Sequence, residues 1–407
     1  MAVANVIATT VSRVKQSGLG TAGSSGSKYM RRVSLELNKQ NDTYQSNEIV
    51  QHQQSTGATQ GPGRIAGTLQ GELSAGSYDL EFAALLRKDF ATAFTAITSV
   101  ALTIAGSGPT YTVTRGSGSY LTDGVKRGMV VRLTVGSLNA ANINKNLLVV
   151  SVGSATVMTV VPLNGVALVA EGPISGCTIS APGKATYAPT TGHTNDYFSW
   201  EKKFTDLSRY ELFTDVKPAS ADVSIPGTGS QIEVSFGMAG LGRTISGSET
   251  LTSPSAASTA NTVAAVQGKI VVNGTVTAVT NIQFTIDGAT STGDPEVGSS
   301  TLSDLQRGKI SVTGSFAAKF SAVTLQTLRD DQTVFTLIAG AADSGAAAAE
   351  FIVFTFPAVK IFSDDASDGG DGQVVRTYQF TAQYNGSGGT GTDTHQTIAQ
   401  IHDSLAA

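Results

Sequence analysis

The sequence of 407 residues has little charge and almost no cysteine, and both shortages narrow what the protein can be. Charged residues make up 14% of the chain, well below the usual quarter, and the formal net charge is −4 at pH 7. A surface that grips nucleic-acid phosphates would carry an excess of Lys and Arg instead. The single Cys177 excludes an intrachain disulfide, and its strand-like surroundings favour a buried side chain over a nucleophile.

Long hydrophobic runs and a secretion signal are also missing. No segment approaches the roughly 20 apolar residues that are needed to cross a bilayer. No basic residue precedes the apolar stretch within residues 1–14, and no small-residue cleavage pattern follows it. We therefore expect a protein that is made in a cytoplasm and does not insert into a membrane.

Groupings that could carry catalysis or hold a cofactor or metal are not found. The four histidines lack metal-ligand spacing and are predicted to be solvated: His52, His193, His395 and His402. The acidic run at residues 364–371 lacks the spacing and closing Glu of a calcium loop, so we interpret it as a solvated turn. The sequence predicts neither an enzyme nor a cofactor.

Gly, Ser, Thr and Ala dominate the chain, and Gly alone contributes 45 residues. This composition is typical of many short strands joined by small-residue turns, with large uncharged polar surfaces. Such surfaces are suited to contacts between copies of one chain.

One structural plan occurs twice, with an offset of 243 residues. Residues 64–73 align with residues 307–316, and Gly71 falls on Gly314. A duplicated unit within one chain usually means pseudo-symmetry, which indicates assembly rather than chemistry.

Each copy combines alternating strands with a helix. Apolar and polar residues alternate at 33–38 and 231–238 in the first copy and at 282–287 and 377–384 in the second. An apolar stripe at helical spacing predicts a helix over residues 78–97, and a similar stripe predicts one after residue 321. We expect each helix to cover the apolar face of a sheet.

A long polar loop is predicted at residues 38–63, with a shorter equivalent at 288–306. Loops of this length are uncommon in compact domains unless they function, so an intersubunit contact is favoured over surface disorder. The first copy is also interrupted by residues 101–185, where five short strand patterns predict an inserted small β-barrel or immunoglobulin-like domain.

These patterns predict a mainly β protein of two tandem β-sandwich domains, each with a flanking helix, plus the insert. The expected regions are a loosely ordered arm (1–28), the first domain (29–100 and 186–250), the insert (101–185), the second domain (251–392) and a C-terminal helix behind Asp393 (393–407).

The chain resembles the tail tube (major tail) proteins of long-tailed, non-contractile bacteriophages. The resemblance rests on Leu35–Leu37, the motif Tyr-Gln-Ser-Asn-Glu-Ile at 44–49, the motif Gly-Thr-Leu-Gln-Gly-Glu-Leu at 67–73 and the helix at 80–90. It is best over residues 29–100 and 195–240 and weaker in the second copy. The family resemblance implies a tail-tube-type sandwich with a flanking helix in each copy.

The resemblance further implies hollow tubes of stacked rings through which genomic DNA passes without specific binding. Six tube domains make one ring, so a chain with two copies is expected to form a homotrimer of pseudo-sixfold shape. The expected partners are other copies of the chain and the tape measure, terminator and distal tail proteins. The protein is then expected in the virion, after assembly in the host cytoplasm, with the insert outside the tube.

Two groups of residues are predicted to serve such a tube. Those expected to line the lumen are Glu36, Gln70, Glu72, Glu233, Thr377, Gln379, Thr381 and Gln383. Those expected to contact the adjacent ring are Tyr44, Gln45, Glu48, Gln51 and Gln53. The near absence of cations in the first group would keep DNA phosphates from adhering.

Two other functions stay open. One is a secreted or surface β-protein whose inserted domain binds glycans, against which the missing signal peptide and disulfides argue. The other is a tail terminator or hub of the same fold, which would form one ring and stop.

Overall fold

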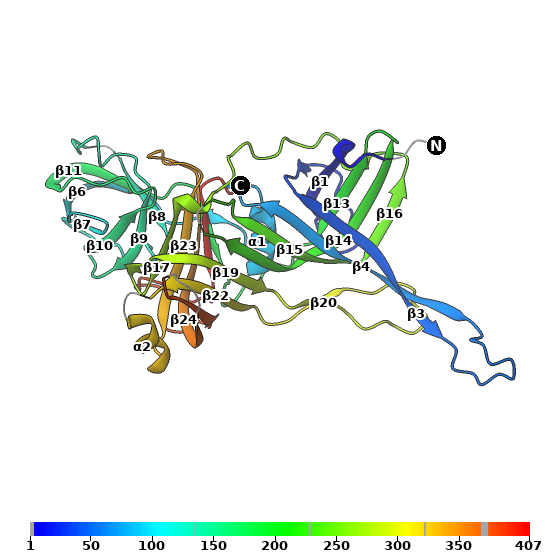
Figure 1. Cartoon of the computed structure of the whole chain (residues 1–407). Helices are drawn as coiled ribbons and strands as arrows, with labels where there is room; N and C mark the ends of the chain where they lie inside the picture. The colour runs from blue at the N-terminus through cyan, green and yellow to red at the C-terminus, as the bar shows by residue number, and fades with distance from the viewer. Residues whose placement is uncertain (1–3, 135, 228, 321–322, 368–372) are drawn as a thin grey trace.

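The computed structural model describes residues 4–134, 136–227, 229–320, 323–367 and 373–407, and it consists mainly of β-strands (Figure 1). The described residues contain two α-helices, α1 (Asp79–Leu86) and α2 (Thr324–Asp330), and two short 3-10 helices at Val6–Ala8 and Ala265–Gln267. None of these helices is long and apolar enough to span a membrane.

Eight strands form one continuous antiparallel array, the inner row, that holds both copies of the repeat. Its order is β3 (Ser34–Gln45), β4 (Ala58–Glu72), β15 (Glu233–Gly240), β14 (Arg209–Ile225), β19 (Val279–Asp287), β22 (Ser311–Lys319), β25 (Val375–Ala382) and β24 (Phe351–Ser367). The first four strands belong to the first copy and the last four to the second, in equivalent order. The two copies meet where β14 pairs with β19.

The glycines that mark the repeat occupy equivalent places in this row. Gly71 of β4 pairs with Val234, and Gly314 of β22 pairs with Phe380. A Cβ on Gly71 would lie 1.8 Å from the Tyr78 hydroxyl, and one on Gly314 would lie 2.5 Å from the Gln283 carbonyl oxygen. Each position therefore requires glycine because a neighbouring group fills the space.

A second layer of strands covers the inner row and completes two sandwiches. In the first copy it contains β2 (Lys28–Tyr29), β1 (Thr9–Lys15), β13 (Phe198–Phe204), the first half of β14 and β16 (Gly242–Ser246). In the second copy it contains β18 (Thr275–Val276), β17 (Gly268–Val272), β23 (Phe335–Ala342), the first half of β24, β26 (Gln400–Asp403), β12 (Lys184–Tyr187) and β5 (Ala91–Thr92). One apolar core runs between the layers through both copies.

Helix α1 packs on the apolar face of the inner row, as the sequence predicts. The ring of Phe82 meets Phe236 of β15 edge-on, with 5.1 Å between centroids, and Phe354 of β24 at 5.5 Å. One helix of the first copy thus contacts strands of both copies.

The insert is a closed six-stranded barrel in the order β10, β7, β6, β11, β8, β9. Its strands are β6 (Ile97–Ala105), β7 (Tyr111–Arg115), β8 (Val130–Thr134), β9 (Leu147–Val152), β10 (Val157–Pro162) and β11 (Glu171–Ser180). The predicted mainly β fold with an inserted barrel is confirmed. Five strands match the five predicted patterns, and Cys177 is buried in the barrel as expected.

The barrel docks on the outer layer of the second copy. Along β9, Leu147 and Val149 point into the barrel, whereas Leu148 and Val150 pack outward with residues of β17, β23 and β24 such as Ile338. This explains why β9 is apolar at four consecutive positions, 147–150. The barrel and the second copy share a buried interface.

The predicted helix at 78–97 is wrong in length. Helix α1 ends at Leu86 because Arg87 takes a left-handed conformation with φ of 62°, which stops the helix. Beyond it, Phe94 and Ile97 are buried in the barrel core rather than on a helix stripe. The periodic apolar spacing came from residues that serve two different cores.

The predicted C-terminal helix is a strand. β26 lies between β12 and β24, and all four of its residues are buried. Within the expected loosely ordered arm, β1 pairs with β13 along seven residues and buries Val11 and Arg13. In both cases pairing with a distant strand, which local spacing does not reveal, decides the structure.

The long loop at 38–63 is mostly a β-hairpin. β3 and β4 stay paired as far as Gln45 and Ala58, so only residues 46–57 form the connecting loop. The hairpin projects from the body at the lower right of Figure 1. The shorter loop of the second copy likewise carries a two-stranded ribbon, β20 (Thr290–Thr292) with β21 (Leu305–Arg307), and a bridge joins Gly63 to Thr301.

Candidate functional site

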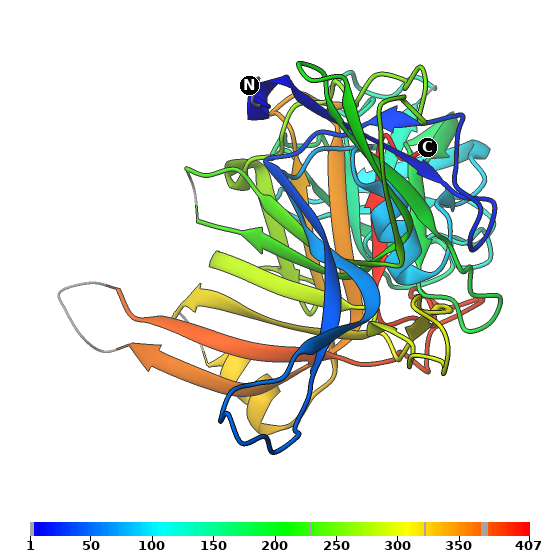
Figure 2. The ribbon, with the colours of Figure 1, turned by 90° about the vertical axis from the view of Figure 1, so that its right-hand side faces the viewer.

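The main candidate site is an open groove on the polar face of the inner row, with a volume of about 690 Å³. Figure 2 shows the strands of this row fanned beside one another. Strand alternation places the polar side chains in this groove while their neighbours, such as Leu69 and Phe236, enter the core. We call this face the polar groove.

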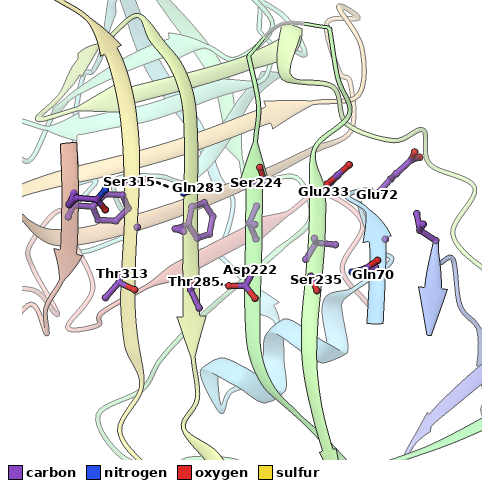
Figure 3. Close-up of a pocket in the computed structure, with 18 of the residues that line it drawn as sticks. Gln70, Glu72, Asp222, Ser224, Glu233, Ser235, Gln283, Thr285, Thr313 and Ser315 are labelled. Carbon is purple, nitrogen blue, oxygen red and sulfur yellow. Dashed lines mark hydrogen bonds between the residues drawn. The ribbon is translucent and has the colours of Figure 1, made fainter. Parts of the chain in front are cut away.

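Side chains of the polar groove follow the strand register in rows that cross both copies (Figure 3). One row contains Gln70, Ser235, Asp222, Thr285, Thr313 and Thr381. The next contains Glu72, Glu233, Ser224, Gln283, Ser315 and Gln379. Hydrogen bonds join neighbours within a row: the Thr285 hydroxyl donates to Asp222, and the Gln283 amide nitrogen donates to the Ser315 hydroxyl oxygen at 3.2 Å.

The two halves of the polar groove differ in charge. The first copy supplies the carboxylates Glu72, Asp222 and Glu233, whereas the second supplies hydroxyl and amide groups to the same rows. Glu72 and Glu233 pair directly across β4 and β15, an arrangement that is tolerated where water screens both charges. The groove is therefore acidic on one side and uncharged on the other.

The structure brings together most residues that were predicted to line a lumen. Gln70, Glu72, Glu233 and Gln379 line the polar groove, and Thr381 continues its first row. The remaining three lie farther along the same strands or just past them: Glu36 pairs with Thr68, Thr377 pairs with Ala317, and Gln383 follows the end of β25.

Sequence reasoning missed the contribution of β14. Asp222 and Ser224 alternate with the buried Ala221 and Val223, which is a strand signal. Pro218 lies within β14, next to a bulge in the pairing with β15, where a proline is tolerated. The alternation at residues 282–287 was recognised, but its polar face was not assigned to the lumen.

The predicted inter-ring residues all lie on the hairpin of β3 and β4. Tyr44 and Gln45 end β3, and Glu48, Gln51 and Gln53 occupy the loop; all five are exposed. Ile49, at the tip, is fully exposed, which is unusual for an isoleucine that has no partner.

Two histidines differ from the prediction that all four are solvated. His402 is fully buried, and burial lowers its pKa to about 4. His395 stacks on Tyr187 with 4.1 Å between ring centroids, and burial together with Lys126 and Lys88 lowers its pKa to about 3. His52 and His193 are exposed as predicted.

The acidic run lies partly outside the described residues, since residues 368–371 are among those not described. Within the described part, Asp364 is buried and binds Arg329 and Arg376, at 2.5 Å from the latter, so it is an ion-pair residue rather than a solvated one. Among the described residues, no three His, Cys, Asp or Glu side chains gather as a metal site.

A buried charge cluster fixes the start of α1. Arg13 of β1 contacts Asp79 at 3.2 Å and Glu81 at 2.8 Å, and all three side chains are buried. Burial raises the pKa of Glu81 to about 7 despite the neighbouring Arg13. With its charges paired inside a closed core, this cluster holds β1 to α1 and offers no opening for a substrate.

The sequence was compared with known proteins. No curated protein matches it. The model of the family described as phage tail tube protein matches residues 7–382, which is nearly the whole chain and includes both copies, the barrel and every strand of the polar groove. The chain belongs to the phage tail tube protein family.

Proposed function

We propose that three copies of this structural virion protein close into a ring with the polar groove inward, and that such rings stack into the hollow tube of a phage tail. One chain supplies two equivalent four-stranded units, so three chains supply the six units of a pseudo-sixfold ring. The observation that carries the proposal is the inner row, in which both copies lie side by side in the same strand order.

The lining of the groove suits the passage of DNA. Hydroxyl, amide and carboxylate groups offer no fixed cation to the phosphates, and the carboxylates of the first copy repel them. DNA would therefore slide past without specific binding when the genome is ejected. We propose that all the predicted lumen residues, including Glu36, Thr377 and Gln383, line the lumen.

The hairpin of β3 and β4 is suited to hold successive rings together. It extends beyond the body of the subunit, and its exposed residues Tyr44, Gln45, Glu48, Gln51 and Gln53 could reach an adjacent ring. The exposed Ile49 would then be covered by that neighbour.

The barrel is suited to the outside of the tube because it packs on the outer layer of the second copy. The protein then acts without catalysis, and its partners are other copies of itself and the tape measure, terminator and distal tail proteins. Assembly would take place in the host cytoplasm before the tail joins the virion.

Electron microscopy of the purified protein tests the proposal. We expect end-on views with a central hole and threefold symmetry, and side views of tubes built from stacked rings. Sixfold rings would refute the trimer while keeping the tube, and single rings that never stack would indicate a terminator or hub. Monomers under all conditions would favour a surface protein.

A further inference from the structure

Lys217 is a buried lysine whose amine lies against the side-chain amide of an asparagine. It belongs to β14 and is only 3% exposed, and its Nζ lies 2.5 Å from Oδ1 of Asn195. Asn195 precedes β13, the strand that pairs with this part of β14. Because a C=O bond is about 1.2 Å long, the contact holds the amine roughly 3 to 4 Å from the amide carbon of Asn195. The two groups therefore stand close to the distance from which an amine attacks a carbonyl.

The contacts of the Lys217 amine do not fix its charge. Among the described residues, Nζ contacts the Asn195 oxygen and the face of the Tyr197 ring, 3.7 Å from its centroid, and it forms no ion pair. Asp196, which follows Asn195 in the chain, is bound by Lys15 at 3.1 Å instead. The amine is therefore buried without a carboxylate against it.

The charges near the amine favour its uncharged form. Arg87 and Arg307 line the same hollow of about 10 Å³ as Lys217. Burial, Arg307 and Arg87 lower the pKa of the Lys217 amine to about 8. Asp304 and Asp196 act in the opposite direction without outweighing them. Burial and neighbouring cations are the conditions under which a lysine amine becomes a nucleophile.

A tyrosine serves the nitrogen of the same amide. Nδ2 of Asn195 donates a hydrogen bond to the Tyr197 hydroxyl at 3.2 Å, and this hydroxyl donates to Oδ1 of Asp304 at 2.6 Å. Burial and the bond with Asp304 raise the pKa of Tyr197 to about 12, so the hydroxyl keeps its proton at neutral pH. Tyr197 is thus placed to give a proton to Nδ2, and Asp304 holds it in position.

We propose that Lys217 and Asn195 form an isopeptide bond within the folded chain. Nζ attacks Cγ of Asn195, and the negative charge that develops on Oδ1 is stabilised by the two arginines of the hollow. The Tyr197 hydroxyl gives a proton to Nδ2 and is restored by the proton that Nζ loses. The bond from Cγ to Nδ2 then breaks as the C=O bond forms again. One amine and one amide become a new amide and one ammonia, with no other reactant.

The bond would fasten the hairpin of β13 and β14 at its open end. Residues 195 and 217 enclose both strands of the pair, so the hairpin could no longer be pulled apart there. The site also lies at the seam between the copies, because Arg87 donates to the carbonyl oxygens of Gly288 and Gly308 at 3.0 and 2.7 Å. All the reacting groups belong to one chain, so the inference does not rest on the proposed ring. The reaction happens once per chain and turns over no substrate.

Mass spectrometry of the full chain tests the bond. We expect the denatured 41.7 kDa protein to be lighter by one ammonia. Trypsin should release residues 185–202 joined to residues 210–243, since Pro218 blocks cleavage after Lys217. In protein purified at pH 6, the bond should form about ten-fold faster at pH 9 than at pH 7, because the uncharged amine is then the main form.

Variants assign the roles. Lys217→Arg should keep the full mass, whereas Lys202→Arg, on the neighbouring strand, should lose ammonia like the wild type. At pH 9, Tyr197→Phe and Asp304→Asn should each slow the reaction at least about ten-fold. The double variant should be no slower than either, because Asp304 acts through Tyr197. Thermal melts check that each variant is folded.

Three results would overturn the proposal. The first is a wild-type protein that keeps its full mass after incubation at pH 9. The second is a loss of ammonia that persists in Lys217→Arg. The third is conversion of Asn195 to Asp without the joined peptides. Each of them would leave the proposed ring untouched.

Discussion

At the scale of single residues, His402 joins three parts of the chain. From β26, its Nδ1 accepts a hydrogen bond from the Val130 N–H of the barrel at 3.0 Å, and its Nε2 lies 2.8 Å from the Pro182 carbonyl oxygen. The Nε2–H tautomer satisfies both contacts, whereas a second proton on Nδ1 would break the first. His402 thus holds the barrel and the C-terminal strand together only while it is neutral.

We therefore expect His402 to make the protein sensitive to acid. Its folded pKa of about 4 lies below the unfolded value of about 6.5, so its contribution is present above pH 6.5 and is lost as the pH falls through 4. The loss amounts to about 3 kcal/mol. The measurement is the free energy of unfolding by urea at pH 7.5 and pH 4.

The matched variants are His402→Asn and His52→Asn, because His52 is exposed in the hairpin loop. The His402 variant should be less stable at pH 7.5 and should lose less stability on acidification than the wild type, whereas the His52 variant should follow the wild type. An unchanged acid dependence in His402→Asn would contradict this account.

At the scale of elements, alternation was a sound guide, whereas helical spacing located α1 and α2 but predicted α1 too long and misassigned the C-terminal tail. The strands at 33–38, 231–238, 282–287 and 377–384 could be predicted because one face is buried and the other solvated. The C-terminal tail could not, since all of β26 is buried between two strands and a fully buried strand has no alternation. Part of the groove lining could be predicted from the alternation, because the solvated side of each recognised strand faces the groove.

The hairpin of β3 and β4 is the element whose removal should separate ring formation from stacking. Replacing residues 46–57 by Asn-Gly keeps the last pair, Gln45 with Ala58, and closes it with a turn that suits a two-residue hairpin. We expect the free energy of unfolding to change by less than about 0.5 kcal/mol, because the loop is exposed. Electron microscopy should show rings without tubes.

The control shortens a hairpin of the barrel by the same means. Residues 106–110 between β6 and β7 are replaced by Asn-Gly, which keeps the pair of Ala105 with Thr112 and the buried Tyr111. This variant should still form tubes. Normal tubes from the variant without residues 46–57 would show that the hairpin does not join rings.

At the scale of the whole molecule, most of the polar groove carries no cations. We therefore expect that cations added to the groove would slow DNA transit. Changing Gln70, Thr313, Gln379 and Thr381 to Lys places four cations per chain on the groove without touching the core. Repeated over many rings, their attraction to phosphates should slow genome ejection about tenfold at low salt and less at high salt. The measurement is the rate of DNA release from particles triggered in vitro.

The comparison variant carries Lys in place of Ser107 and Ser117, which are exposed on the barrel. Assembly and ejection should both be normal in it. Wild-type ejection rates from the groove variant would show that the lining does not govern transit.

The covalent fusion of two unequal copies has a consequence for the electrostatic field that DNA meets in such a tube. In a three-chain ring the acidic half of the groove alternates with the uncharged half, so at the level of the groove the wall carries three negative sectors separated by three neutral ones. If successive rings are rotated by a constant angle, these sectors wind along the tube like a three-start screw thread. A duplex that follows the neutral channels between the threads would turn as it advances, and the pitch of the tube would set the sense and amount of that rotation.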